Sequence, residues 1–365
     1  MQQLLSIWGE AYTCRIGVWF LGMHLWCKFM EFLQMKHLIC VFICELSLLC
    51  LSLRCKQKDL YAFCETKESR IRMDIVITYV NGDDPEWQAD YADCVGTKTN
   101  AKRYRDWGTL PYLLRGIEEC LPFVENVFLV VARESQVPAW INRDAVRVVL
   151  HRDFIPAQFL PTFNSTAIEM FLHRIDGLAE EFIYFNDDFF PLMPCRPNDF
   201  FRKGKAAASM GHHLFTFNTL YRIQTKRSDC LARQVAGINL KLFFVRPQHT
   251  CAPMLKSVCA ELYERCNAAI LASVTPLRTK INYNQYIFTD YAYFTGRTFR
   301  RRLSNSHISL SVATTKKLIK SIVHPKCKLA CINDVNMPED RFLRLQECLL
   351  NAFRTRFPKK SRFEI

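Results

Sequence analysis

From Met73 onward, short runs of β-branched and aromatic residues alternate with segments of helical periodicity, and this alternation constrains the fold more than any other feature. Each run has the length and composition of a buried strand. The runs are Asp74–Val80, Asn126–Ala132, Ala145–Leu150 and Phe182–Phe185. Strands that alternate with helices predict an α/β fold in which helices flank a mostly parallel sheet.

The helical segments carry recognisable start signals. Leu110–Leu121 has leucines and isoleucine at helical spacing and a proline in its first turn. Ile168–Ile175 follows a Thr166–Glu169 pair that is typical of a capping box. Met337–Phe353 predicts a C-terminal helix, and its apolar face is Phe342, Leu345, Leu349 and Phe353. Residues 200–330 are less regular and predict an insertion.

The first 72 residues have a different character. They contain the apolar run His37–Leu53, which includes Glu45 and is short for a membrane span of roughly 20 residues. It could be a marginal membrane anchor, an ordinary apolar helix, or upstream sequence attached through a wrongly assigned start. We favour the last, because the enzyme-like pattern begins at Met73, and we expect residues 1–72 to be dispensable for the chemistry.

Composition narrows the class of protein. Hydrophobic residues make up 50% of the chain, and the low counts of 12 Gly and 15 Pro exclude collagen-like and generally disordered proteins. The formal charge of +14 favours an anionic partner, such as nucleotide phosphate, acidic polysaccharide, nucleic acid or a lipid surface. The 17 cysteines are odd in number and irregularly spaced, which favours structural thiols in a reducing compartment.

Two predicted strands end in acidic loops, where sheets of this kind place ligands. The first loop is Asn81–Trp87, whose Asn-Gly and Asp-Pro pairs are also typical of turns. The second is Asn186-Asp187-Asp188, whose oxygens suit a hard divalent cation, although an N-cap or exposed turn is the alternative. If the second loop stays extended, side chains alternate, so Asp188 faces the pocket and Asp187 hydrogen-bonds the scaffold.

Other candidate residues give only a weak indication of function when each is taken alone. Arg105 precedes a helix start, where a phosphate could bind, and His249 lies in a loop-like stretch where it could act as a general base. Surface charge and an ordinary histidine are the alternatives. The sequence lacks the P-loop, Rossmann, zincin and α/β-hydrolase motifs, which disfavours those four classes of enzyme.

Taken together, these segments resemble the Stealth family of sugar-phosphate transferases. That family includes bacterial capsular polysaccharide phosphotransferases and the catalytic part of the animal GlcNAc-1-phosphotransferase. The resemblance covers residues 73–365 and has four parts in the family's order. The parts are residues 73–87 (with DIVITYVNGDDPEW at Asp74–Trp87), 105–190 (with LPTFNSTAIEMFLHRIDGLAEEFIYFNDDFF), 249–284 (His249, Arg278 and Asn282-Tyr283-Asn284) and 327–365 (Cys331-Ile-Asn-Asp334 and the tail).

The resemblance implies a modified GT-A-like fold and transfer of a hexose-1-phosphate from a nucleotide-diphosphate sugar to a sugar hydroxyl, with release of nucleoside monophosphate. The setting is capsular or extracellular polysaccharide biosynthesis. It implies Mg²⁺ or Mn²⁺, a UDP-sugar donor, a polysaccharide or oligosaccharide acceptor, and a cytoplasmic location, with peripheral membrane association as an option. The implied catalytic residues are Asp188, His249 and Arg278; the substrate-binding residues are Gly82, Asp83, Arg105, Asn164 and Glu169; the metal ligands are Asn186, Asp188, Asn333 and Asp334.

Three other functions stay open at this point. A metal-dependent glycosyltransferase would use the same donor and transfer the sugar without its phosphate. A nucleic-acid-binding protein would show basic residues clustered on one face, whereas here they are scattered apart from Arg297–Arg302 and the tail, so we expect no nucleic-acid partner. A non-catalytic capsule-assembly scaffold would show no turnover with any donor.

Overall fold

The computed structural model describes residues 72–365 except 97–103, 215–218, 240–242, 311–312 and 334–336. The predictions for the N-terminal segment therefore lie outside the described residues, apart from Arg72, and so does the predicted metal ligand Asp334. Within the described part of the chain, every helix is too short or too polar to cross a membrane.

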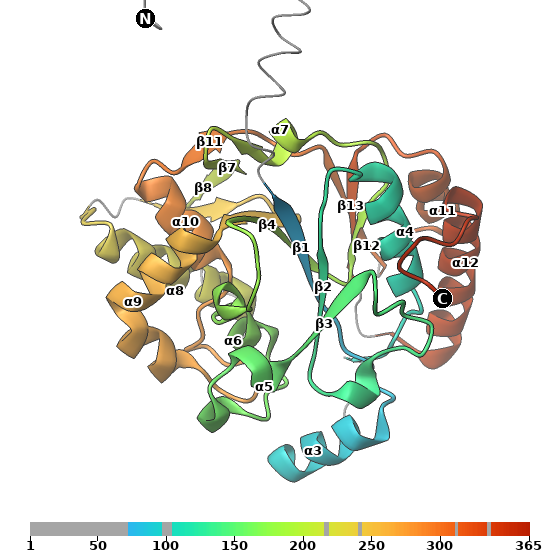
Figure 1. The fold of residues 1–365 in the computed structure, drawn as a ribbon, viewed down its shortest axis with the longest axis horizontal. Helices are drawn as coiled ribbons and strands as arrows, with labels where there is room; N and C mark the ends of the chain where they lie inside the picture. The colour runs from blue at the N-terminus through green and yellow to red at the C-terminus, as the bar shows by residue number, and fades with distance from the viewer. Residues whose placement is uncertain (1–71, 97–103, 215–218, 240–242, 311–312, 334–336) are drawn as a thin grey trace, which may run out of the picture. The chain divides into compact units, whose positions relative to one another are not determined.

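A five-stranded sheet lies at the centre of the fold, in the order β10-β4-β1-β2-β3 (Figure 1). Four of its strands are parallel and confirm the predicted strands, while β10 pairs antiparallel with β4 at one edge. Helices cover both faces, so these strands are almost continuously buried. The strands are β1 (Met73–Thr78), β2 (Val127–Val131), β3 (Val146–Leu150), β4 (Glu181–Asn186) and β10 (Ala252–Leu255).

The order of these strands places a change of winding direction between the neighbouring strands β1 and β4. The chain runs from β1 to β2 and β3 on one side, then returns to place β4 on the other side of β1. In open sheets of this type, ligands bind outside the carboxyl ends of the strands where the direction of winding reverses. The loops after Thr78 and Asn186, which are register partners, therefore lie at the expected place for a ligand.

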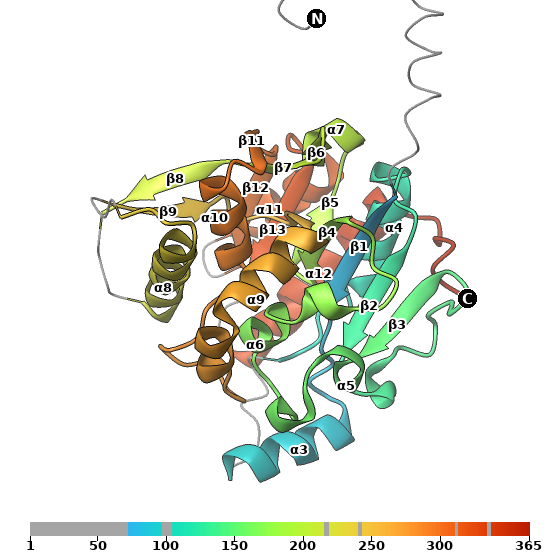
Figure 2. The same ribbon diagram turned by 60° about the vertical axis from the view of Figure 1, so that its left-hand side comes forward.

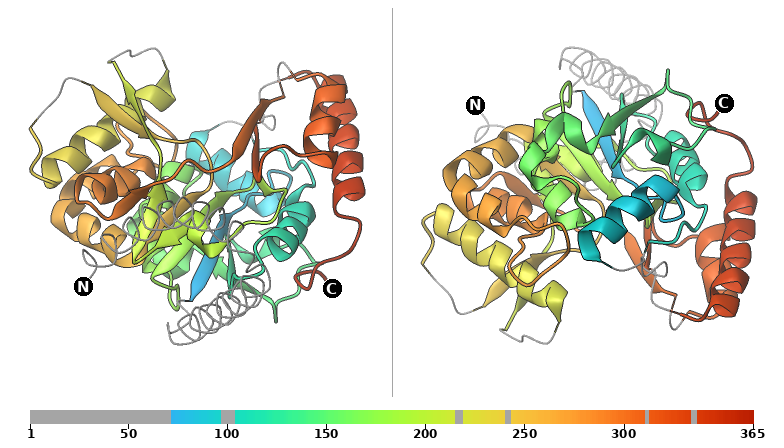
Figure 3. Two further views of the ribbon diagram at one scale, coloured as in Figure 1. Left: turned by 90° about the horizontal axis from the view of Figure 1, so that it is seen from above. Right: turned by 90° about the horizontal axis from the view of Figure 1, so that it is seen from below.

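Two groups of long helices flank the sheet on opposite sides (Figures 1 and 3). One group is α4 (Leu110–Cys120), α11 (Thr315–Val323) and α12 (Glu339–Arg356); the other is α8 (Leu220–Val235), α9 (Lys256–Ser273) and α10 (Tyr286–Phe294). The predicted C-terminal helix is confirmed as α12, and its four predicted apolar residues are all buried. The other helices are α3 (Pro85–Val95), α5 (His151–Phe154), α6 (Ser165–Glu169) and α7 (Pro197–Phe200).

Three smaller sheets complete the structure. One of them bears on the site: β5 (Phe189–Pro191) follows β4 after a two-residue turn and pairs with β13 (Leu329–Asn333), which pairs in parallel with β12 (Asn305–Ser309). The turn after β4 therefore joins the central sheet to this smaller one. The other strands are β6 (Phe201–Arg202), β7 (Lys205–Ala208) and β11 (Thr298–Arg300) in one sheet, and β8 (Met210–His213) with β9 (Phe244–Pro247) in a pair next to α8 (Figure 2).

Two local predictions are wrong. The capping box at Thr166 does not form, because Asn164 is the N-cap of α6 and its Oδ1 accepts the backbone N–H of Thr166 at 3.1 Å. Residues 200–330 are also more regular than predicted, since they contain α8, α9 and α10. Helix α8 buries mainly polar residues, so the sequence has no apolar periodicity there that would predict a helix. These buried polar residues include Gln224, Thr225, Ser228 and Asp229.

The cysteines of the described part of the chain are free thiols. Five of these ten thiols are buried. Burial raises the pKa of Cys120 and of Cys195 to about 12, so both stay protonated and unreactive at neutral pH.

Candidate active site

Two polar cavities meet at the carboxyl ends of β1 and β4. Cavity A has a volume of about 260 Å³ and lies beside the loop after β1. Its wall includes Trp87, Tyr104 and Phe163, whose rings pack edge to face with centroids 4.9 and 5.2 Å from that of Trp87. Cavity B has a volume of about 740 Å³ and lies between the α8–α10 helices and the β12-β13 sheet; its wall includes Glu169, Arg246, His249, Tyr286, Arg302 and Asn333.

Four residues border both cavities: Ser165, Asn186, Asp188 and Arg278. Asp188 also borders cavity C, a smaller space of about 150 Å³ beside Arg105 and Trp107. Among the described residues, Asp188 alone borders all three spaces. A group bound in one cavity can therefore meet a group bound in the other at this carboxylate.

The turn after β4 corrects the prediction of strict side-chain alternation. The strand ends at Asn186, and Asp187 and Asp188 form a turn, so the period of two no longer holds. Both carboxylates border cavity A, and both residues are half-buried. The small sheet holds the turn, because the backbone N–H of Ile332 donates to the Asp188 carbonyl at 2.9 Å and the Cys331 thiol lies 3.5 Å from Asp188 Oδ2.

Asn186 is positioned by a chain of hydroxyl groups. The Tyr184 hydroxyl donates to Asn186 Oδ1 at 2.7 Å and lies 3.0 Å from Thr78 Oγ1. Burial raises the pKa of Tyr184 well above its usual value, so this hydroxyl keeps its proton. The Asn186 side chain is therefore fixed at the border of the two cavities.

Arg278 places a positive charge at the same border. One of its terminal nitrogens donates to Ser165 Oγ, while its buried Nε has no hydrogen-bond partner among the described residues. Nearby, burial raises the pKa of Glu169 to about 7, although Arg278 and the backbone N–H of Gln285 oppose this shift. An unsatisfied guanidinium N–H beside a polar cavity favours a bound anion.

His249 lies on the wall of cavity B. Its Nδ1 is 3.0 Å from the Tyr286 hydroxyl, and its ring packs edge to face against Phe189. Burial lowers the pKa of His249 to about 4, with smaller contributions from His307 and Arg246. The imidazole is therefore neutral near pH 7 and able to accept a proton.

The other predicted site residues lie at varied distances from this border. Arg105 borders cavity C, where its guanidinium lies 4.2 Å from the Phe342 ring and 3.6 Å from Glu339. Asn333 borders cavity B. Asn164 is buried beneath the site, and its Nδ2 donates to Asn282 Oδ1 and to nearby carbonyls, so it positions the backbone.

In the loop after β1, Gly82 shapes the wall of cavity A without bordering the cavity itself. Gly82 and Asp83 do not border cavities A, B or C, and Asp83 is exposed. A Cβ on Gly82 would lie 2.1 Å from the carbonyl oxygen of Tyr104, so glycine is required there for the two backbones to approach. This contact sets the position of Tyr104 in the wall of cavity A.

Sequence reasoning missed several residues of both walls. Tyr104, His151 and Ser165 border cavity A, but no sequence signal singled them out as site residues. Arg302 borders cavity B from within the basic run at 297–302, which could have been read as an anion-binding signal. His307 had no sequence signal, because only the pairing of β12 with β13 brings it to the site.

One segment of the chain matches the model of a known family. Residues 103–209, which contain the acidic turn, Ser165 and Asn164, match the model of Stealth protein CR2, conserved region 2. This segment is therefore similar to conserved region 2 of Stealth proteins. The match covers the segment that supplies β4 and much of the wall of cavity A.

The proteins that this chain is similar to are named as polysaccharide phosphotransferases. The capsular polysaccharide phosphotransferase WcwK of Streptococcus pneumoniae is 28% identical over 80% of this chain and 99% of its own length. The exopolysaccharide phosphotransferase cps2G of Lactiplantibacillus plantarum is 29% identical over 80% of this chain and 96% of its own length. The receptor polysaccharide phosphotransferase WefC of Streptococcus oralis is 42% identical over a shorter stretch, 36% of this chain and 41% of WefC.

A solved galactosyltransferase, LgtC in complex with donor and acceptor sugar analogs, covers 80% of this chain and 98% of its own. Its sequence identity is 12% and its TM-score is 0.38, a likeness too low to carry an argument.

Proposed function

We propose that this chain is a Stealth-family polysaccharide phosphotransferase that moves a sugar 1-phosphate from a nucleotide-diphosphate sugar to a hydroxyl of a sugar acceptor. Nucleoside monophosphate leaves. The observation that carries the proposal is the meeting of two polar cavities at Asp188 and Arg278, which suits a reaction between two bound substrates. The names of relatives aligned over nearly their whole length support the phosphotransferase class.

Cavity A is the proposed donor site. Its aromatic wall can pack against a base or ribose, and its polar edge leads to Arg278. The free Nε–H of Arg278 would bind an oxygen of the diphosphate. The donor phosphorus next to the sugar would then lie at the border with cavity B.

A divalent cation, Mg²⁺ or Mn²⁺, fits the oxygen donors at this border. Mg²⁺ takes one or two carboxylates and keeps waters and substrate phosphates as its other ligands. Asp188 offers the carboxylate, and Asn186 and Asn333 offer amide oxygens on the wall of cavity B. Asp334 follows Asn333 in the sequence and is a further candidate ligand. A bound cation would neutralise charge on the diphosphate and its leaving group.

Cavity B is the proposed acceptor site. As the acceptor oxygen forms its bond to the sugar-linked phosphorus, the bond from that phosphorus to the oxygen shared with the nucleoside phosphate breaks. The hydroxyl proton passes to Nε2 of His249, whose Nδ1 faces Tyr286. A neutral imidazole is suited to this step, and Asp188 is the competing candidate for the base.

The fate of the donor phosphate tests the proposal. Purified full-length chain is incubated with nucleotide sugars that are labelled in the phosphate next to the sugar, and the products are separated. Phosphotransfer puts the label in the acceptor product and releases nucleoside monophosphate. Label in released nucleoside diphosphate would instead identify a glycosyltransferase and refute the proposal.

A further inference from the structure

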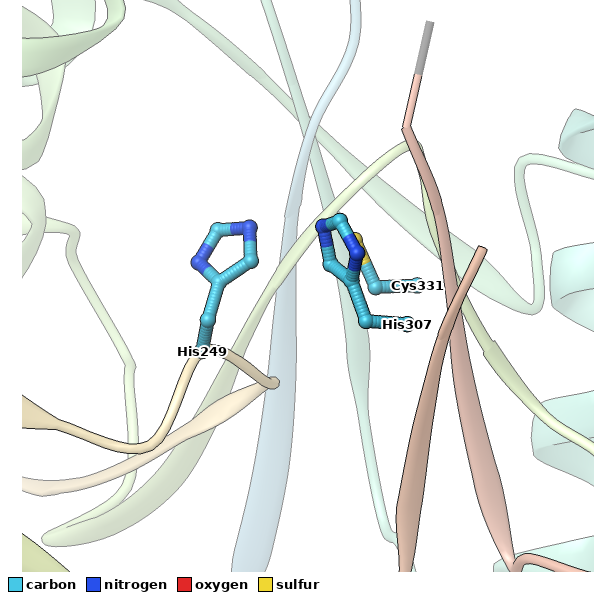
Figure 4. Close-up of side chains that lie close together, drawn as sticks. All are labelled: His249, His307 and Cys331. Carbon is cyan, nitrogen blue, oxygen red and sulfur yellow. The ribbon is translucent and has the colours of Figure 1, made fainter. Parts of the chain in front are cut away.

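We propose that His249, His307 and Cys331 form a binding site for Zn²⁺ on the wall of cavity B, separate in chemistry from the hard-cation site. The three side chains each present one ligand atom, and these atoms all lie within 4.8 Å of one another (Figure 4). In the described part of the chain, no other three histidine, cysteine or acidic side chains meet this condition.

Strand pairing places two of the ligands. β12 and β13 are parallel, and His307 is the register partner of Cys331. Residues paired in this way present their side chains on the same face of the sheet. The imidazole and the thiol are therefore neighbours through backbone hydrogen bonds, and their proximity does not depend on a chosen side-chain conformation.

Two hydrogen bonds place the third ligand. The Asn305 side chain, two residues before His307, donates from Nδ2 to the His249 carbonyl at 2.9 Å. The Tyr286 hydroxyl lies 3.0 Å from His249 Nδ1. Nε2 is left as the ligand atom, and Figure 4 shows this nitrogen turned toward His307 and Cys331. Outer-shell contacts of this kind fix the orientation of metal-binding histidines.

The donor set selects the class of metal. Two imidazoles and a thiolate are typical ligands of Zn²⁺ and poor ligands of Mg²⁺. Zn–N bonds of roughly 2.1 Å and Zn–S bonds of roughly 2.3 Å put tetrahedral ligand atoms about 3.4 to 3.6 Å apart. The cluster must therefore contract by about 1 Å, which rotation of the exposed His307 side chain allows.

A fourth ligand lies beside the cluster. Asp188 Oδ2 is 3.5 Å from Cys331 Sγ, and a carboxylate oxygen is a suitable fourth ligand for a tetrahedral zinc site. Its negative charge favours a cation, whereas Arg246 and Arg302 on the wall of cavity B oppose one. The bound metal must also displace the Cys331 proton, as metals that bind thiolates do.

Zinc at this site would inhibit the reaction, and this part of the inference rests on the proposed function. A metal on His249 Nε2 occupies the nitrogen that would accept the proton of the acceptor hydroxyl. If it also takes Asp188, it removes a ligand from the hard-cation site. The enzyme would then be supported by Mg²⁺ and inhibited by Zn²⁺ through two sites that share Asp188.

Cobalt binding tests the site independently of activity. The full-length chain, reduced and free of chelator, is titrated with Co²⁺ and followed by absorption, since a cobalt–thiolate bond gives a near-ultraviolet charge-transfer band. We expect one equivalent of Co²⁺, displaced by Zn²⁺, and loss of the band in Cys331→Ser. Because Cys331 is buried, His307→Ala provides a second variant at an exposed position, and both variants are checked by thermal melting.

His307→Ala should weaken Zn²⁺ binding more than ~10-fold, because even outer-shell partners of metal ligands contribute about 10- to 100-fold. Matched controls are Cys195→Ser, a second buried thiol, and His324→Ala, a second exposed histidine, and both should bind as the unaltered protein does. Absence of the thiolate band, or equal affinity in His307→Ala and His324→Ala, would overturn the site.

An activity measurement tests the inhibition separately. Each variant is assayed with Mg²⁺ at rising Zn²⁺, and the rate is compared with that variant's own rate without Zn²⁺. His307→Ala should need at least ~10-fold more Zn²⁺ for half-inhibition. Cobalt bound through Cys331 without any inhibition would contradict the inhibitory role while leaving the binding site intact, so failure of the proposed function and failure of the site give different results.

Discussion

Cavities A and B share a border but are built in different ways. Apart from Arg278, the wall of cavity A comes from residues 78–188, the stretch of chain that contains four strands of the central sheet or their ends and the segments between them. The wall of cavity B comes from residues 165–333, which span α6, α8, α10 and two smaller sheets. One cavity thus follows from a local pattern of strands and loops, whereas the other needs long-range packing.

The two walls also differ in chemistry. The wall of cavity A has an aromatic cluster around Trp87. The wall of cavity B has two arginines and two histidines, which are Arg246, Arg302, His249 and His307. This contrast supports our proposal that the donor nucleotide binds in cavity A and the polar acceptor in cavity B. Variants on one wall should therefore alter the use of one substrate, and variants at the shared border should alter both.

The largest expected effect is the loss of activity when the divalent cation is removed from the border between the two cavities. Activity should disappear when the enzyme is treated with a chelator, because Asp188, Asn186 and Asn333 would lose the cation that neutralises the diphosphate. Restoring Mg²⁺ or Mn²⁺ should restore turnover, measured as nucleoside monophosphate release. Full activity in the presence of EDTA would remove the cation from the mechanism.

Arg278→Gln should give the next largest effect. It removes the charge and the free Nε–H from the border while keeping a polar side chain, so kcat should fall by about 10²- to 10³-fold. Arg143→Gln, an exposed arginine paired with Glu134, is the matched control and should leave kcat unchanged. Equal kcat values for the two variants would show that Arg278 does not contact the reacting phosphate.

One variant on each wall should show which substrate each cavity binds. Tyr104→Ala should raise the donor KM by about 10-fold, since stacking against a base is worth about 1–3 kcal/mol. Arg302→Ala should raise the acceptor KM by a similar factor of about 10, consistent with loss of a charged hydrogen bond of about 1.5–3 kcal/mol. Steady-state kinetics with each substrate varied in turn would check both. The reverse pattern would exchange the roles of the cavities.

The smallest expected effect concerns acid stability. Each cavity has one histidine whose pKa burial lowers to about 4, His151 in A and His249 in B. The unfolded chain takes up protons below the ordinary pKa of about 6.5 while the folded protein does not until about pH 4, so the free energy of unfolding falls across that window as the pH is lowered.

His151→Asn stays neutral at every pH and should reduce this acid-side loss by about 1–3 kcal/mol. His249→Asn should reduce it less, because His249 is only half-buried. Urea unfolding at neutral pH and near pH ~4.5 would measure both. An unchanged acid-side loss in His151→Asn would mean that its imidazole is protonated in the folded protein.

The contrast between the cavities also explains how far sequence reasoning could go. The four parallel strands and the acidic turn were predictable, because buried strands appear as continuous apolar runs and polar residues follow them. α8 was not, because Gln224, Thr225, Ser228 and Asp229 are the residues that it buries. His307 could not be predicted as a neighbour of Cys331, since register between distant strands is set by packing of the whole sheet.

The role of Asp187 could not be predicted for a related reason. Alternation holds only while the backbone is extended, and here the chain turns directly after Asn186 to enter the smaller sheet. Asp187 therefore borders cavities A and C but not B, while Asp188 borders all three. These adjacent carboxylates have the same chemistry and differ in which cavities they reach.

The most direct test of the account compares Asp187→Asn with Asp188→Asn in the full-length chain. Both changes keep the side-chain shape and remove one charge, and melting temperatures would confirm that both proteins fold. We expect Asp188→Asn to lower kcat by about 10³-fold or more, because it removes the charge from the place where donor and acceptor meet. Asp187→Asn should retain most of its kcat and show mainly a raised donor KM. Equal losses of kcat, or a larger loss in Asp187→Asn, would contradict the assignment of the reaction to the border at Asp188.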